Sequence, residues 1–227
     1  MTIAPSLERP WHTVEHRPGV AGLGWRVCVG HRATGCVSVL RGADRLRVVV
    51  AEPLSDTCPR GVRERLESLA GDLLLAGAGL SESVDRLVRQ VDEGRRTAPQ
   101  AGLILVDLLA GGHVHVVCRY APSAVHLAAD GLALLPDPPG TGEATAGLTA
   151  GDHLLAYSGT FLEAVPPGTL AGLRERHPDA DSCGLWQALA STADQGAGRA
   201  AAPDLAVITW SGGRRGRRTG RWSSRSV

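Results

Sequence analysis

The chain has 227 residues, of which 43% are hydrophobic and 4% aromatic, so it can build one large domain around an aliphatic core. Its 24 basic residues, all arginines, balance 23 acids to a net charge of +1. No apolar run approaches the roughly 18–20 residues of a membrane span, the first residues do not resemble a signal peptide, and the five cysteines contain no C-x-x-C pair. We therefore expect a soluble, cytoplasmic protein with reduced thiols and no zinc ribbon.

The first half of the chain predicts strands followed by helices. Residues 1–20 are polar and contain proline, and we expect them to form a flexible N-terminal arm. Short runs that alternate valine with other residues predict three strands, at 24–30, 35–40 and 45–52. Leucines at helical spacing then predict a helix over 60–78. A second helix is predicted over 80–94, with Val84 and Val88 in its apolar stripe.

The second half predicts mainly hairpins. Two apolar runs flank the Gly111–Gly112 turn, a pattern typical of a β-hairpin. A second hairpin is expected around Asp130–Gly131, and residues 136–151 are expected to form a loop rich in Pro, Gly and Thr. The remaining pattern predicts a strand, two helices and a last strand, at 153–158, 169–176, 182–192 and 205–210. The order of elements indicates an α+β fold in which helices cover the outer faces of antiparallel sheets.

Four stretches within residues 30–210 carry recognisable patterns. They read GCVSVLRGADRLRVVVAEPLSD, GLILVDLLAGGHVHVVCRYAPSAVHLAADG, LTAGDHLLAYSGTFLEA and PDLAVITW. Together they resemble the motifs of the metal-dependent Ser/Thr protein phosphatase (PPM) family, in its compact bacterial SpoIIE-like branch. The resemblance implies an αββα four-layer sandwich of two mainly antiparallel sheets flanked by helices. The phosphatase-type domain would span residues 21–210, followed by an Arg-rich disordered tail at 211–227.

The resemblance also implies a site, and at that site the sequence departs from the family. Family members hydrolyse phosphoserine or phosphothreonine with two bridged Mn²⁺ or Mg²⁺ ions, which activate water and clamp the phosphoryl oxygens. Such ions prefer carboxylate ligands, which the family supplies as Asp side chains at strand ends. Other residues stand at the matching positions here: Cys36, Glu52, Pro53, Gly159 and Pro203. We therefore expect no catalytic residues and no metal cofactor at this degenerate site.

Three acids remain close to these motifs in the sequence: Glu52, Asp56 and Asp204. They predict either solvated residues near strand ends, which we favour, or a weak site for one cation with Glu52 and Asp204 as its ligands. The Gly-His-Pro of the family's central segment is also replaced, by Tyr120, Ala121 and Pro122.

Two further candidates have simple structural alternatives. Cys36 is either a reactive thiol or a small buried apolar residue, and nothing in the sequence beside it indicates an activating base. His113 and His115 are two apart on a predicted strand and therefore share a face. That face either ligates a metal or is the polar outer side of a hairpin, and we favour the second interpretation.

The last residues of the chain are strongly basic. The arginines of this segment are candidates for binding an anionic partner: Arg214, Arg215, Arg217, Arg218 and Arg221. Such a tail can bind nucleic acid or an acidic protein surface, or stay solvated. Because no nucleic-acid-binding module is recognisable in the body of the chain, we do not favour nucleic acid as the partner.

The sequence therefore supports three hypotheses of different classes. The first is a pseudophosphatase, a silent regulatory module that binds a phosphoprotein or kinase of bacterial signalling, in the manner of anti-sigma-factor partner switching. The second is a divergent, active phosphatase that uses Glu52, Asp56 and Asp204 with Mn²⁺ or Mg²⁺. The third is a nucleic-acid-binding protein that acts through its Arg-rich tail. We favour the first, since removing even one carboxylate ligand severely weakens a site for hard metal ions.

Overall fold

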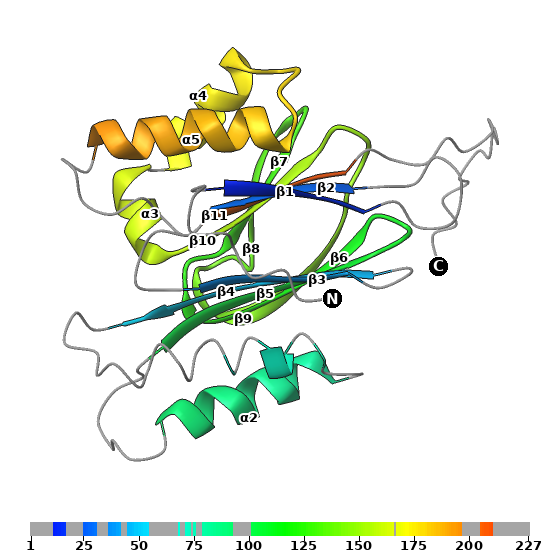
Figure 1. The fold of residues 1–227 in the computed structure, drawn as a ribbon, viewed down its shortest axis with the longest axis vertical. Coiled ribbons are helices and arrows are strands. Elements are labelled where there is room, and N and C mark those ends of the chain that lie inside the picture. Colours follow the sequence, from blue (N-terminus) through cyan, green and yellow to red (C-terminus); the bar gives the residue numbers. More distant parts are fainter. Residues whose placement is uncertain are drawn as a thin grey trace, which may run out of the picture.

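The computed structural model of the protein describes residues 11–16, 25–30, 36–41, 45–54, 68, 71–73, 75, 79–92, 101–165, 167–196 and 205–210. These residues build two antiparallel sheets packed face to face, with helices on both outer faces (Figure 1). The α+β class and the αββα sandwich expected from the sequence are confirmed.

The first sheet has six strands and joins both halves of the chain. Its order is β1 (Trp11–His16), β2 (Trp25–Gly30), β11 (Leu205–Trp210), β10 (His153–Tyr157), β7 (Ala124–Ala128) and β8 (Gly131–Leu135). All its neighbouring strands are antiparallel. The pairing of β2 with β11 joins segments of the chain that are far apart in the sequence.

The second sheet has five strands and contains the longest ones. Its order is β3 (Cys36–Arg41), β4 (Arg45–Pro53), β5 (Ala101–Leu109), β6 (His113–Ala121) and β9 (Gly140–Gly147). The predicted β5–β6 hairpin is present, and Gly112 in its turn has a φ of +80°, a conformation that favours glycine. β4 and β5 are almost entirely buried because both of their faces are covered.

Helices cover the outer face of each sheet. α2 (Leu80–Asp92) lies on the second sheet, and α3 (Gly159–Ala164), α4 (Pro167–Arg176) and α5 (Ser182–Gly196) lie on the first (Figure 1). The predicted stripe of α2 is confirmed, since Val84 and Val88 are buried against the sheet. Residues 68, 71–73 and 75 are also helical, which agrees with the helix expected before α2 over that part of its span.

Alternation along the strands divides the apolar side chains between separate cores. In β4, Val48 and Val50 belong to the core between the sheets, whereas Val49 belongs to the core beneath α2. A third core lies between the first sheet and its helices and includes Leu155 and Phe161. Successive side chains of a strand point to opposite faces of the sheet, so each central strand needs an apolar layer on both sides. Burying each such side chain stabilises the fold by about 1.5–3 kcal/mol, which favours the layered architecture.

Two expectations require correction, and one further element was not predicted. Residues 11–16, assigned to the flexible arm, form β1 and pair along their whole length with β2. Residues 140–147, assigned to a loop, form β9 and pair with β6. Residues 159–164, for which no element was predicted, form α3. β9 reads GTGEATAG, which has low strand propensity, so its conformation depends on the backbone ladder offered by β6 rather than on its own side chains.

Candidate functional site

The end of β4 and the start of α3 meet at one close polar contact. The backbone N–H of Gly159 donates a hydrogen bond of 2.6 Å to Oε1 of Glu52, although the two residues are 107 positions apart. Glu52 is the penultimate residue of β4, and its relative exposure is 9%. The first N–H groups of a helix lack partners within the helix, and a carboxylate satisfies such a group strongly. The structure thus brings two of the predicted site positions into contact.

The space around Gly159 explains why no side chain stands there. A Cβ atom at this position would lie 3.0 Å from Oε1 and 3.6 Å from Oε2 of Glu52. The first of these distances is shorter than ordinary van der Waals contact, so the carboxylate would have to move. Glu52, which is one methylene longer than Asp, and Gly159, which has no side chain, are therefore complementary in shape.

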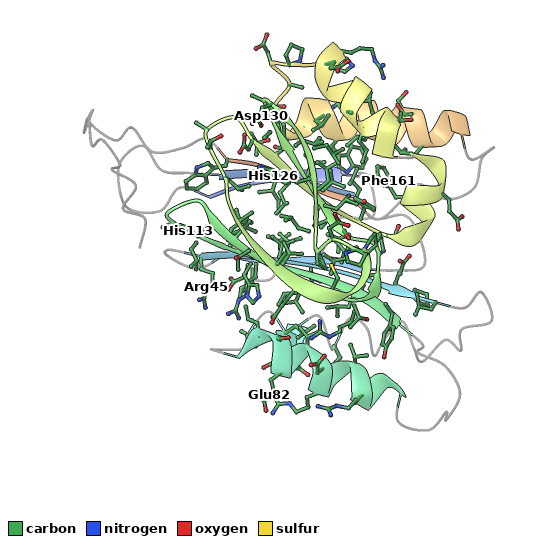
Figure 2. The ribbon with its side chains drawn as sticks, turned by 180° about the vertical axis from the view of Figure 1, so that it is seen from behind. Arg45, Glu82, His113, His126, Asp130 and Phe161 are labelled. Carbon is green, nitrogen blue, oxygen red and sulfur yellow. The ribbon has the colours of Figure 1, made fainter. Side chains whose placement is uncertain are left out.

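The residues before Gly159 form a buried frame. Tyr157, at the end of β10, is 1% exposed, and its ring centroid lies 5.2 Å from that of Phe161 in α3. Figure 2 labels Phe161, which belongs to the core under α3, α4 and α5. Burial raises the pKa of Tyr157 far above its usual value, so its hydroxyl stays protonated. Tyr157 and the end of β10 therefore pack into this core.

An exposed rim borders the contact between Glu52 and Gly159. Leu54 and Tyr120 are 41% and 45% exposed, respectively. Tyr120 has a φ of +51°, the left-handed region that non-glycine residues rarely occupy. The carbonyl oxygen of Tyr120 lies so close to Gly102 that a Cβ there would be only 2.6 Å away. Glycine adopts this backbone conformation without the steric cost that a Cβ brings.

The remaining predicted positions are placed only in part. Cys36 begins β3 and pairs with Ala51, the neighbour of Glu52. Pro53 ends β4 and pairs with Ala101. The other candidates lie outside the described residues: Asp56, Pro203, Asp204, Arg214, Arg215, Arg217, Arg218 and Arg221.

Among the described residues, the carboxylate that lies at this site is that of Glu52. A two-metal centre needs several oxygen ligands that converge on both ions. Within the described ranges no group of three or more His, Cys, Asp or Glu side chains is placed to hold a metal. The carboxylate that the structure places here, Glu52, already accepts a hydrogen bond from the protein backbone.

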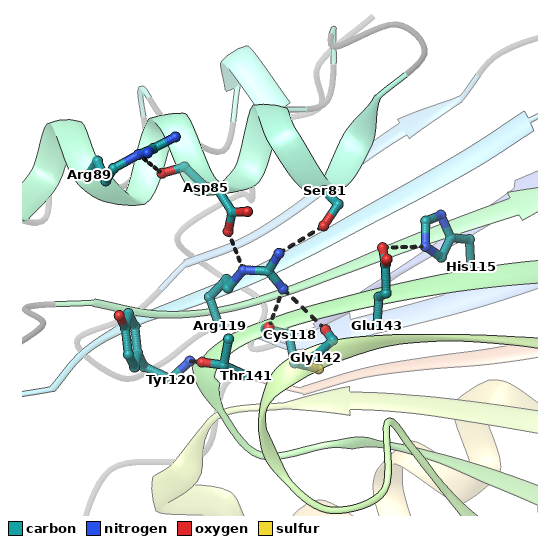
Figure 3. Close-up of polar contacts among 10 residues, drawn as sticks. All are labelled: Ser81, Asp85, Arg89, His115, Cys118, Arg119, Tyr120, Thr141, Gly142 and Glu143. Atoms are coloured by element: carbon teal, nitrogen blue, oxygen red, sulfur yellow. Dashed lines mark hydrogen bonds and ion pairs between the residues drawn. The ribbon is translucent and has the colours of Figure 1, made fainter.

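A second polar centre, Arg119 of β6, was not anticipated from the sequence. Figure 3 shows its guanidinium between β6 and α2, where it binds the carboxylate of Asp85 and donates to the hydroxyl of Ser81 at 2.8 Å. It also donates to the carbonyls of Cys118 and Gly142, at 2.9 and 3.2 Å. The hydrogen bond from Arg119 lowers the pKa of Asp85. Arg119 therefore ties α2 to the β6–β9 edge.

The predicted histidine pair lies on the same outer face but at the far end of the sheet. His113 is exposed, and Nε2 of His115 lies 3.3 Å from a carboxylate oxygen of Glu143 on β9. Beside them Asp107 of β5 binds both Arg45 and Arg47 of β4, each at 3.2 Å. The sequence signal for this cluster was the presence of charged residues within two otherwise apolar strands.

The arrangement of sheets and helices matches one known class of protein fold. Two antiparallel sheets packed face to face, covered by helices on both outer sides, form the PPM-type (PP2C-type), SpoIIE-like phosphatase fold. No protein-family model matches the sequence, and no curated protein matches it. The likeness therefore comes from three-dimensional structure, and it shows the fold.

Several solved structures share this architecture. The RsbU and RsbW domains of Rv1364c from Mycobacterium tuberculosis match with a TM-score of 0.62 and 14% identity, over 90% of this chain and 61% of that one. This chain thus spans less than two thirds of that structure. The PP2C phosphatase domain of SpoIIE from Bacillus subtilis, with a fragment of its regulatory domain, matches with a TM-score of 0.61 and 11% identity, over 89% of this chain and 72% of that one. RsbX in complex with magnesium matches with a TM-score of 0.59 and 10% identity, over 88% of this chain and all of RsbX.

Among the described residues, no helix is both long and apolar enough to span a bilayer.

Proposed function

We propose that this protein is a catalytically silent phosphatase-like module that regulates bacterial signalling by binding a protein. The observation that carries the proposal is the contact between Glu52 and Gly159. The carboxylate that would face a metal in an active relative is instead bonded to the backbone at 2.6 Å.

Electrostatics supports a silent site. A phosphoryl group is anionic, and metal phosphatases offset that charge with two divalent cations. Without those cations, the negative charge of Glu52 repels an incoming phosphate, and no group of comparable charge activates the attacking water. The difference between such a site and an active one is several kcal/mol of transition-state stabilisation, enough to abolish measurable turnover.

The exposed rim supports a role in binding. Leu54 and Tyr120 offer apolar surface beside the closed site, and aromatic residues often anchor protein interfaces. Tyr120 keeps a strained backbone conformation that glycine would relieve, as is common at functional positions. By analogy with its structural neighbours, the partner would be a phosphoprotein or a kinase of a cytoplasmic signalling pathway.

The proposal is tested by a phosphatase assay with p-nitrophenyl phosphate at millimolar Mn²⁺ or Mg²⁺. We expect no turnover above that of the Glu52→Gln variant, with the catalytic domain of an active metal-dependent Ser/Thr phosphatase as the positive control. Metal-dependent turnover by the wild type that Glu52→Gln abolishes would establish the divergent phosphatase instead.

The tail hypothesis has a separate test. If residues 211–227 bind nucleic acid, affinity for DNA will fall steeply with salt and disappear when this segment is deleted. We expect the deletion to leave the proposed protein-binding function intact, because the rim lies elsewhere in the chain.

A further inference from the structure

The outer face of the second sheet has two chemically different halves. Under α2 the face is apolar and includes Leu103, Leu105 and Val117. Towards the β5–β6 turn the same face becomes polar. There Arg47, Asp107, His115 and Thr145 stand opposite one another across β4, β5, β6 and β9. These polar side chains are not part of the apolar core beneath α2, and three of them line a cavity beside the start of that helix.

The polar half borders a cavity. The cavity has a volume of about 790 Å³ and lies between the start of α2 and the ends of the strands, lined by Arg45, Ser81, Asp107, His113, His115 and Thr145 among others. Figure 2 labels Arg45 and His113 at this end of the sheet. The volume falls within the range of about 300–1,000 Å³ that is typical of small-molecule sites.

A buried ion pair supports the view that this cavity is a binding site. The side chains of Arg47 and Asp107 are 3% and 5% exposed, respectively. Burying such a pair rarely stabilises a fold more than apolar residues of the same volume would. The pair is accounted for if Arg47 holds Asp107 in position to bind Arg45. Nε of Arg45 lies 3.2 Å from Oδ1 of Asp107, and both residues line the cavity.

The acids of the cavity are already engaged, whereas donors remain. Asp107 accepts from two arginines, and Glu143 pairs with His115. Arg45 uses Nε for this contact, so its terminal nitrogens are not part of it, and its side chain is 42% exposed. The hydroxyl of Ser81 accepts from Arg119 and can still donate its own hydrogen. A complementary ligand must therefore bring acceptor oxygens.

We propose that this cavity binds a small organic anion through a phosphate or carboxylate group, with Arg45 as the main cationic contact. The hydroxyls of Ser81 and Thr145 and the imidazole of His113 complete the set of donors. Arg45 is seven residues from Glu52 on β4, a separation of about 23 Å at the rise of a strand. The anion site is therefore distinct from the site at Glu52 and independent of its catalytic silence.

The test is a calorimetric and NMR titration of the full chain with inorganic phosphate and, separately, with citrate. We expect saturable 1:1 binding of at least one anion, with shifts of the ring protons of His113 and His115. Losing a charge-assisted hydrogen bond typically weakens binding about 10-fold or more, which is the effect expected for Arg45→Gln. The matched control is Arg176→Gln, which removes the same charge from the exposed end of α4 on the opposite side of the molecule.

The two anions distinguish the sources of the ligand. Tighter binding of phosphate assigns a phosphorylated ligand, and tighter binding of citrate assigns a carboxylate ligand. Because Arg45 also contacts Asp107, His113→Gln serves as a second variant, and thermal melts check that each variant folds. Absence of saturable binding by both anions would overturn the proposal, as would equal weakening by Arg45→Gln and Arg176→Gln.

Discussion

The absence of a Cβ atom at Gly159 leaves room for the carboxylate of Glu52. A Cβ at Gly159 would approach Glu52 Oε1 to 3.0 Å, so we expect Gly159→Ala to displace the carboxylate and destabilise the fold by about 1 kcal/mol. Urea denaturation measures the change. The control is Gly168→Ala in α4, where a new Cβ would meet nothing within 4 Å. That variant should be neutral or slightly stabilising, because alanine is the better helix former.

The same contact predicts coupling between the two residues. Glu52→Asp withdraws the carboxylate by one methylene, so Gly159→Ala should cost less in that background than in the wild type. Residues in contact typically show interaction energies of about 0.5–3 kcal/mol in a double-mutant cycle. Additive effects of the two substitutions would mean that the carboxylate does not occupy this position in solution.

Tyr120 makes a second prediction at the residue scale. Its φ of +51° costs about 1–2 kcal/mol for a residue with a Cβ, and glycine avoids this cost. We therefore expect Tyr120→Gly to be more stable than Tyr120→Ala by about 1 kcal/mol, whereas at ordinary backbone positions glycine is the less stable of the two. Thermal melts of both variants check the order, and alanine being the more stable would contradict the assigned conformation.

At the scale of elements, α2 depends on a polar tie as well as on its apolar stripe. The hydrogen bond from Arg119 lowers the pKa of Asp85, so the native state favours the ionised carboxylate. The stabilisation is therefore present above the usual aspartate pKa of about 3.9 and is lost as the pH falls through the lower folded value. We expect Asp85→Asn to be less stable than the wild type at pH 7, with the difference shrinking towards pH 3.

Hydrogen exchange locates this effect. The amides of α2 should exchange faster in Asp85→Asn at pH 7, while those of α5 on the other sheet should not change. Glu82→Gln provides the control, since Glu82 is an exposed acid in the first turn of the same helix. Equal acceleration in both variants would show that charge on the helix surface, rather than the tie to Arg119, stabilises α2.

At the scale of the whole molecule, the proposed silent site predicts indifference to metal. A ligand present at 100 times its Kd stabilises the folded state by about 2.7 kcal/mol, which is easily detected in a melt. We expect millimolar Mn²⁺, Mg²⁺ or EDTA to leave the midpoint of thermal unfolding unchanged. A metal-dependent rise that Glu52→Gln removes would show that the site binds cations after all.

Most strands of the two sheets could be predicted because their own residues carry the apolar pattern of a strand. Runs such as RLRVVVAE and GLILVDLL contain the alternating or continuous apolar residues of buried strands, and they form β4 and β5. β1 and β9 escaped prediction because their sequences are polar or small, and they become strands only by pairing with β2 and β6. Local pattern is informative where side chains drive the fold and uninformative where the backbone of a neighbour does.

The candidate site also has features that the sequence predicts and features that only the structure shows. The sequence by itself determined the residues at these positions, and from the resemblance it predicted that Cys36 and Gly159 replace acids of the family. Only the tertiary structure decided what Glu52 does: it bonds the backbone of Gly159 across 107 residues, in space that a Cβ would invade. The cavity beside Arg45 likewise exists only in three dimensions, since its lining comes from four strands and a helix. The hydrogen-bond partner of Glu52 and the shape of the cavity arise from packing between distant segments, and no local sequence pattern encodes them.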